Sequence, residues 1–157
     1  MREDKKIEKA YNWLSEKMKQ LIGNPIDPNT KHPVWAWYQL RNKQERPDLR
    51  WIEFKGYREP MVLIEFCKNR QDILLSDEPR WTYGPLNDCP CWSMNKQICN
   101  QERNWYYELD VPPESKEAWK KETWNRVFDV SNTEHIQATF WQLQRSEIKK
   151  VWIFNEK

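Results

Sequence analysis

Four cysteines and two histidines are the side chains of this sequence that are best suited to metal binding or nucleophilic catalysis. Cys89, Cys91 and Cys99 lie close together, but only one residue separates the first two and no second pair follows. Structural zinc sites usually take pairs of cysteines separated by two to four residues, so we expect free thiols and no metal. His32 and His135 each precede an apolar stretch, and we expect both to be polar residues at strand entries.

The most direct sign of a ligand is Gln137, a long amide inside an apolar stretch. A second apolar stretch carries two tryptophans, Trp35 and Trp37. Strand alternation places Trp35 and Trp37 on one face, and Gln137 and Trp141 on one face of a second strand. A buried amide needs hydrogen-bond partners, which either the backbone or a ligand supplies. If the two strands pair with these faces on the same side, the residues line one cavity. If helices cover that face, the indoles fill the core.

The candidate ligand-binding residues combine flat stacking surfaces with one amide and one cation. Trp81 adds a stacking surface, and Arg50 or Arg80 provides a positive charge for a phosphate. Because base stacking on an aromatic ring contributes roughly 1–3 kcal/mol, two such faces and one arginine predict about micromolar affinity for a nucleotide. The full set comprises Trp35, Trp37, Arg50, Trp81, Gln137 and Trp141.

Composition excludes several functional classes. The sequence has 3 glycines and neither a GxGxxG nor a Walker A segment, so it has no glycine-rich phosphate loop. The net charge of +2 gives no electrostatic case for a nucleic-acid partner. No Ser–His, H-E-x-x-H or paired-carboxylate motif stands out, and no catalytic residue or cofactor is assigned. The unusual feature is the 11 tryptophans, which form a core of large flat side chains or bind something.

Neither a membrane span nor a signal peptide is apparent. No apolar run approaches the roughly 18 residues of a span, and residues 1–6 are strongly charged. We therefore expect a cytoplasmic protein with reduced thiols and no membrane partner. The length of 157 residues predicts a single domain over 1–157.

The pattern of apolar residues predicts an α+β fold, with a small mixed or antiparallel sheet and two main helices packed on it. The first helix is expected to contact the sheet through Tyr11, Leu14 and Met18 and to end at Gly23. An irregular aromatic- and cysteine-bearing insertion is expected at about 78–112. We expect helices over 4–22 and 114–127, central strands over 33–40, 60–67 and 136–143, and shorter strands over 51–54, 72–77 and 148–154.

Several motifs resemble those of a bacterial and phage family named domain of unknown function 3841. They follow one another from about residue 8 to 154, and the Trp-Ala-Trp-Tyr and Gln-Ala-Thr-Phe-Trp segments are the most specific. Members usually open with a short Leu-Trp-Thr segment before the first helix, whereas this sequence begins at the helix. The stretch 88–112 matches the family pattern least, and the resemblance implies no established activity. The motifs include Tyr11-x-Trp13, His32-Pro33-Val34-Trp35-Ala36-Trp37-Tyr38, Pro47-Asp48-Leu49-Arg50, Leu74-Leu75-Ser76-Asp77 and Ile136-Gln137-Ala138-Thr139-Phe140-Trp141.

Three functions fit these observations. The first is a binding module without catalysis, which holds a nucleotide or nucleotide signal in an aromatic pocket. The second is an enzyme of the ADP-ribosyltransferase type, active or degenerate, in which Gln137 lies beside the nicotinamide ribose; this rests on fold analogy. The third is a protein-interaction domain, which the excess of tryptophan fits equally well.

Overall fold

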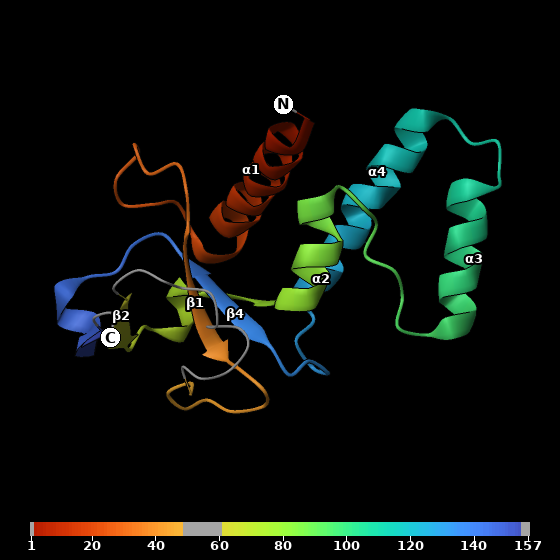
Figure 1. Cartoon of the computed structure of the whole chain (residues 1–157). Coiled ribbons are helices and arrows are strands. Elements are labelled where there is room, and N and C mark those ends of the chain that lie inside the picture. Colours follow the sequence, from red (N-terminus) through yellow and green to blue (C-terminus); the bar gives the residue numbers. More distant parts are fainter. Residues whose placement is uncertain (1, 49–60, 155–157) are drawn as a thin grey trace.

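The computed structural model describes residues 2–48 and 61–154, and it has the expected α+β fold. A three-stranded sheet and a two-stranded sheet are both antiparallel (Figure 1). The helices are α1 (Arg2–Ile22), α2 (Glu78–Tyr83), α3 (Lys96–Tyr107) and α4 (Pro113–Thr123), and the strands are β1 (Val34–Gln39), β2 (Met61–Phe66), β3 (Leu74–Asp77), β4 (Ile136–Phe140) and β5 (Ile148–Phe154).

The three-stranded sheet has the order β1-β4-β3, so β4 is its central strand, as the sequence predicts. The expectation that β1 is also central is wrong for the part of the chain that the structure describes, where β1 pairs only with β4. Alternation along β1 also fails at its end, because the register shifts between Trp37 and Gln39 and leaves Tyr38 in a bulge. The expected strand over 51–54 lies outside the described residues.

Helix α1 covers one face of this sheet through the side chains that the sequence predicts. Leu14 and Met18 are completely buried, and Tyr11 packs beside them against the tryptophans of the core. The apolar positions recur every three or four residues, which places them on one face of the helix. Gly23 ends the helix with a φ of 86°, a left-handed conformation that glycine adopts without strain.

The second sheet pairs β2 with β5, and within residues 2–48 and 61–154 the expectation of a central strand over 60–67 is wrong. Val62 is 56% exposed and Ile153, its partner on β5, is 69% exposed. A nearly continuous apolar run is typical of a strand covered on both faces, but these side chains of the pair are exposed in the part of the chain that the structure describes. Phe66, at the end of β2, packs against Phe140 and joins this pair to the opposite face of the three-stranded sheet.

The region 78–128 contains more helix than the sequence predicts. The Asp77 side chain accepts a hydrogen bond from the backbone N–H of Arg80 and caps α2. Helix α3, capped by Asn95, was not expected, and none of its residues is buried. In Figure 1 it is the helix farthest from β1 and β4. Within the described residues, no helix is long and apolar enough to cross a membrane.

Candidate functional site

The face of the three-stranded sheet beneath α1 carries two rows of side chains that run across the strands. Residues directly opposite one another in neighbouring strands share a face. The pairing therefore forms one row from Trp37 on β1, Gln137 on β4 and Ser76 on β3. The adjacent row consists of Trp35, Thr139 and Leu74. The shared face predicted for the two tryptophans and Gln137 is thus present.

This face holds an unusual group of unpaired polar atoms. Trp35 Nε1, Ser76 Oγ and Gln137 Oε1 are buried and have no hydrogen-bond partner among the described residues. By contrast, the buried hydroxyl of Thr139 donates to the carbonyl oxygen of Leu74 at 3.2 Å. Because buried polar groups in native proteins nearly always have a partner, three such atoms on one face require an explanation. We call Trp35, Ser76 and Gln137 the unpaired group.

The two tryptophans of β1 have different surroundings. Trp35 packs under α1 and α2, with ring centroids 6.2 Å from Tyr11 and 5.1 Å from Trp81. Trp37 is 39% exposed and meets the His135 imidazole edge-on, at 6.3 Å between ring centroids. Trp35 and Trp81 therefore belong to the packed core, whereas Trp37 retains a surface that a flat ligand can contact.

The remaining candidate residues are separate from this row. Trp141 is buried, and its indole N–H donates to the carbonyl oxygen of Gly23 at 2.7 Å, which ties β4 to the end of α1. Arg50 lies outside the described residues. Arg80, a second arginine of the region, donates to the carbonyl oxygen of Arg126 at 2.7 Å and lies 3.6 Å from the Asp77 carboxylate.

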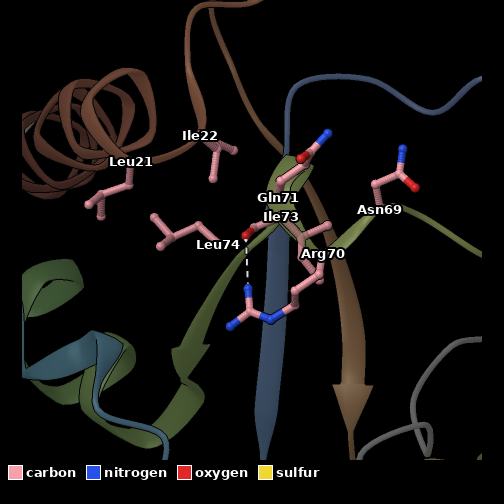
Figure 2. Close-up of a pocket in the computed structure, with 7 residues that line it drawn as sticks. All are labelled: Leu21, Ile22, Asn69, Arg70, Gln71, Ile73 and Leu74. Carbon is pink, nitrogen blue, oxygen red and sulfur yellow. Dashed lines mark hydrogen bonds between the residues drawn. The ribbon is translucent and has the colours of Figure 1, made fainter.

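Two cavities in the described part of the chain are lined by residues other than the candidates. The larger, about 690 Å³, lies where α1 ends and β3 begins. Figure 2 shows Leu21, Ile22 and Leu74 gathered on one side of it, while the Arg70 guanidinium folds back to donate to the carbonyl oxygen of Ile73 at 3.4 Å. The second, about 450 Å³, lies over Trp13 between α1 and α4.

A second polar cluster includes Lys9 of α1, and each of its members has a partner. Lys120 Nζ lies 2.7 Å from both Asp88 and Glu117, and Lys9 reaches the same two carboxylates. Burial alone would raise the pKa of Asp88 and of Glu117, but the lysines outweigh it and lower both pKa values. Burial likewise opposes the charge of Lys120, and its two carboxylate partners nonetheless raise its pKa. We call these four residues the charged group.

The cysteines are free thiols in different environments. Cys89 is exposed, whereas Cys91 is buried against Gly84, and burial raises the pKa of the Cys91 thiol to about 12. A thiol with such a pKa is protonated at neutral pH and is a poor nucleophile. Among the residues that the structure describes, no group of three His, Cys, Asp or Glu side chains is placed to hold a metal ion.

Ser76 is the site residue that sequence reasoning missed. It follows Ile73, Leu74 and Leu75 in an apolar run, and it is 1% exposed. The sequence contains a signal for Ser76. Alternation in a strand places it on the same face as the apolar Leu74, where a hydroxyl is unexpected. The pairing of β3 with β4 that brings it to Gln137 is not visible in the sequence.

Comparison with known proteins identifies the family of the chain. No curated protein and no solved structure matches it. The model of one family, described as a domain of unknown function (DUF3841), matches residues 2–149 of 157. This match spans α1, the three-stranded sheet, β2 and the row that contains Gln137, so the chain belongs to the DUF3841 family.

Proposed function

We propose that this chain is a small-ligand binding module that holds a planar, nucleotide-like ring on Trp37, beside Gln137 and Ser76. The observation that carries the proposal is the row across the sheet, in which a half-exposed indole lies next to two buried and unpaired polar atoms. A mostly apolar site with a few oriented polar groups is typical of small-molecule recognition.

The unpaired atoms support a ligand because leaving them unsatisfied is unfavourable. A buried polar group without a partner costs about 1–3 kcal/mol relative to a satisfied one. The same chain pairs its charged group completely, and it pairs the neighbouring Thr139 hydroxyl. A molecule from solution that satisfies Ser76 and Gln137 therefore recovers free energy that the chain alone does not.

Trp37 supplies the second part of the site. Its exposed surface allows a flat ring to stack, a contact worth roughly 1–3 kcal/mol. Each hydrogen bond to the row adds about 0.5–1.5 kcal/mol. Together these contacts predict a dissociation constant of about 1 mM rather than about 1 μM.

The test uses the indole N–H signals of the 11 tryptophans in nuclear magnetic resonance spectra. Trp37→Phe identifies the signal of Trp37, and Trp152→Phe identifies a control signal from β5. We expect nucleosides, nucleotides or NAD to shift the Trp37 signal and leave the Trp152 signal in place. Product analysis of the NAD sample distinguishes turnover from binding.

The Gln137→Ala variant separates a ligand-binding role from a structural one. If Gln137 contacts a ligand, the melting temperature remains close to that of the parent while the ligand-induced shift of Trp37 is lost. Gln101→Ala, at an exposed position of α3, is the matched control and retains both properties. A clear fall in melting temperature for Gln137→Ala, with no ligand that shifts Trp37 in the parent, contradicts the proposal.

A further inference from the structure

We infer that the larger cavity, at the end of α1, is a second ligand site that takes a medium-chain aliphatic carboxylic acid. The inference goes beyond the proposed function, because the cavity shares no lining residue with the row that contains Trp37. Its basis is the position of the cavity, the aliphatic side chains in its walls and the single charge among them.

The cavity has the size of a small-molecule site and lies between fixed parts of the fold. Its volume of about 690 Å³ is within the range of about 300–1,000 Å³ that is usual for such sites. Its walls come from the last turn of α1, from residues 69–71 and from the start of β3. Leu74 pairs with Thr139 of the sheet, and the indole N–H of Trp141 holds the carbonyl oxygen of Gly23 just after α1. Both sides of the cavity are therefore preformed.

The apolar part of the lining is aliphatic. Ile73 and Leu74 are each 8% exposed and Ile22 packs against the core, so these three side chains form a buried floor. Leu21 lies beside Ile22 and Leu74 in Figure 2, but it is 57% exposed. Among the described residues that line the cavity none is aromatic, so a flat base finds no ring to stack on. A hydrocarbon chain that covers Leu21 and the floor matches these walls, because burial of its methylene groups is favourable.

The polar part of the lining determines the head group of the ligand. Arg70 is the one charged residue among the described lining residues, and Figure 2 shows Asn69 and Gln71 on the side away from Leu21. A guanidinium group has five N–H donors and holds a carboxylate through two parallel hydrogen bonds. Its hydrogen bond to the carbonyl oxygen of Ile73 is 3.4 Å long, beyond the usual range of about 2.7–3.2 Å, so a carboxylate replaces it readily. One cation balances one negative charge, which favours a carboxylate over a phosphate dianion.

The end of α1 sets the direction in which the acid binds. Leu21 and Ile22 are the last two residues of this helix. The carbonyl groups of a helix end carry a partial negative charge, which disfavours an anion and has little effect on a hydrocarbon. The acid therefore binds with its carboxylate at Arg70 and its chain along Leu21 and Ile22.

The experiment titrates the full chain with sodium octanoate and with three matched ligands. Octanol keeps the chain and lacks the charge, hexanoate shortens the chain, and octyl phosphate changes the head group. Calorimetry measures the affinities. We expect octanoate to bind about tenfold more tightly than octanol, the effect of one charge-assisted contact. We expect the same factor of about ten over hexanoate, which lacks two methylene groups, and no tighter binding of octyl phosphate.

The indole N–H signal of Trp141 in nuclear magnetic resonance spectra shows where the acid binds. This N–H donates to Gly23 beside the cavity, so octanoate is expected to shift its signal. The signal of Trp37 is expected to stay in place, because Trp37 does not line the cavity.

Two pairs of variants test the two parts of the lining. Arg70→Gln is expected to weaken octanoate binding about tenfold and to leave octanol binding unchanged. Its control is Arg145→Gln, at an exposed arginine of another short 3-10 helix outside the cavity. Leu21→Ala is expected to weaken both ligands about fivefold, and Ile26→Ala, at a position that is 77% exposed and outside the cavity, is its control. All four positions are exposed, so each variant is expected to fold.

Four results each overturn this inference. They are saturable binding of octanoate that is no tighter than that of octanol, equal effects of Arg70→Gln and Arg145→Gln, tighter binding of octyl phosphate than of octanoate, and no binding of octanoate below its micelle concentration. None of them bears on the proposed function, which is tested at Trp37 with nucleosides, nucleotides and NAD. A failure of those ligands to shift Trp37 likewise leaves the cavity and its acid unaffected.

Discussion

The two polar clusters beside α1 differ in how their hydrogen bonds are met. In the charged group, Lys9, Asp88, Glu117 and Lys120 satisfy one another over distances of 2.5–2.7 Å. In the unpaired group, three neutral atoms on the sheet face have no partner among the described residues. Lys9 of the charged group belongs to α1, and Trp35 of the unpaired group packs against Tyr11 of the same helix, so both groups border α1.

The contrast separates structural polar groups from those that are available to a ligand. A buried charge without a partner costs more free energy than an unpaired neutral group, and the chain pairs its charged group. A neutral hydroxyl or amide is less costly to leave unpaired, so a binding face can retain it until a ligand arrives. The predictions below test this distinction by removing parts of α1, of the charged group and of the sheet face in turn.

The largest expected effect follows the loss of packing by α1, which both clusters share. Leu14 is completely buried, and Leu14→Ala is expected to lower the free energy of unfolding by about 2–5 kcal/mol. Leu21→Ala, on the same helix at a position that is 57% exposed, is the matched control and should change it by less than about 0.5 kcal/mol. Urea unfolding measures both. Equal effects would mean that α1 does not cover the sheet in solution.

The next effect concerns the charged group. The side chain of Lys120 is only 5% exposed. Lys120→Met leaves Asp88 with Lys9, and leaves Glu117 with Lys9 and the more distant Lys121. Since both carboxylates are partly exposed and regain water, we expect a loss of about 1–3 kcal/mol at neutral pH. Lys121→Met is the control, because it removes only a half-exposed contact with Glu117 at 3.8 Å. A loss no larger than that of the control would show that this pairing does not contribute to stability.

The same variant has a predictable dependence on pH. The pKa values of Asp88 and Glu117 lie below their ordinary values of 3.8 and 4.5, so the folded state binds these protons less readily than the unfolded state. Their contribution is present above the unfolded pKa values and is lost as pH falls through the folded ones. The difference in unfolding free energy between parent and Lys120→Met should therefore shrink from about pH 5 to about pH 2. A difference that stays constant contradicts the assignment of the lowered pKa values to Lys120.

The sequence predicts the elements that depend on local pattern. Helix α1 follows from its apolar spacing and Gly23, and β4 follows from the alternating segment that begins at Ile136. The neighbours of a strand depend on long-range pairing, and for this reason the apolar β1 and β2 were both expected to be central. Helix α3 was missed because its contacts are made largely by aromatic side chains outside a regular apolar stripe.

The candidate site was predictable in part for the same reason. Alternation correctly places Trp35 and Trp37 on one face, and it correctly separates Gln137 from its neighbours on β4. Which strand lies on the other side of β4 is not a local property, so Ser76 was not found. The packing of Trp81 over Trp35 depends on the position of α2, which local pattern also does not determine.

A smaller effect is expected at a paired hydroxyl on the sheet face. Thr139 is completely buried and donates to the carbonyl oxygen of Leu74, and valine has nearly the same shape without the hydroxyl. Thr139→Val is therefore expected to lower the free energy of unfolding by about 1 kcal/mol, the net value of one hydrogen bond. Thermal and urea unfolding measure it. An unchanged stability would remove the difference in pairing between Thr139 and Ser76.

The smallest expected effect, at Ser76, is the sharpest test of the comparison. Ser76 is 1% exposed and lies on the same face of the sheet as Thr139. The oxygen of Ser76, however, has no partner among the described residues. Ser76→Ala breaks no hydrogen bond and removes a buried polar atom, so stability should change by less than about 0.5 kcal/mol or rise slightly. A loss as large as that of Thr139→Val, in protein free of added ligand, would mean that a bound water already satisfies the hydroxyl. The unpaired group would then be structural like the charged group, and the case for a ligand on this face would lose its main support.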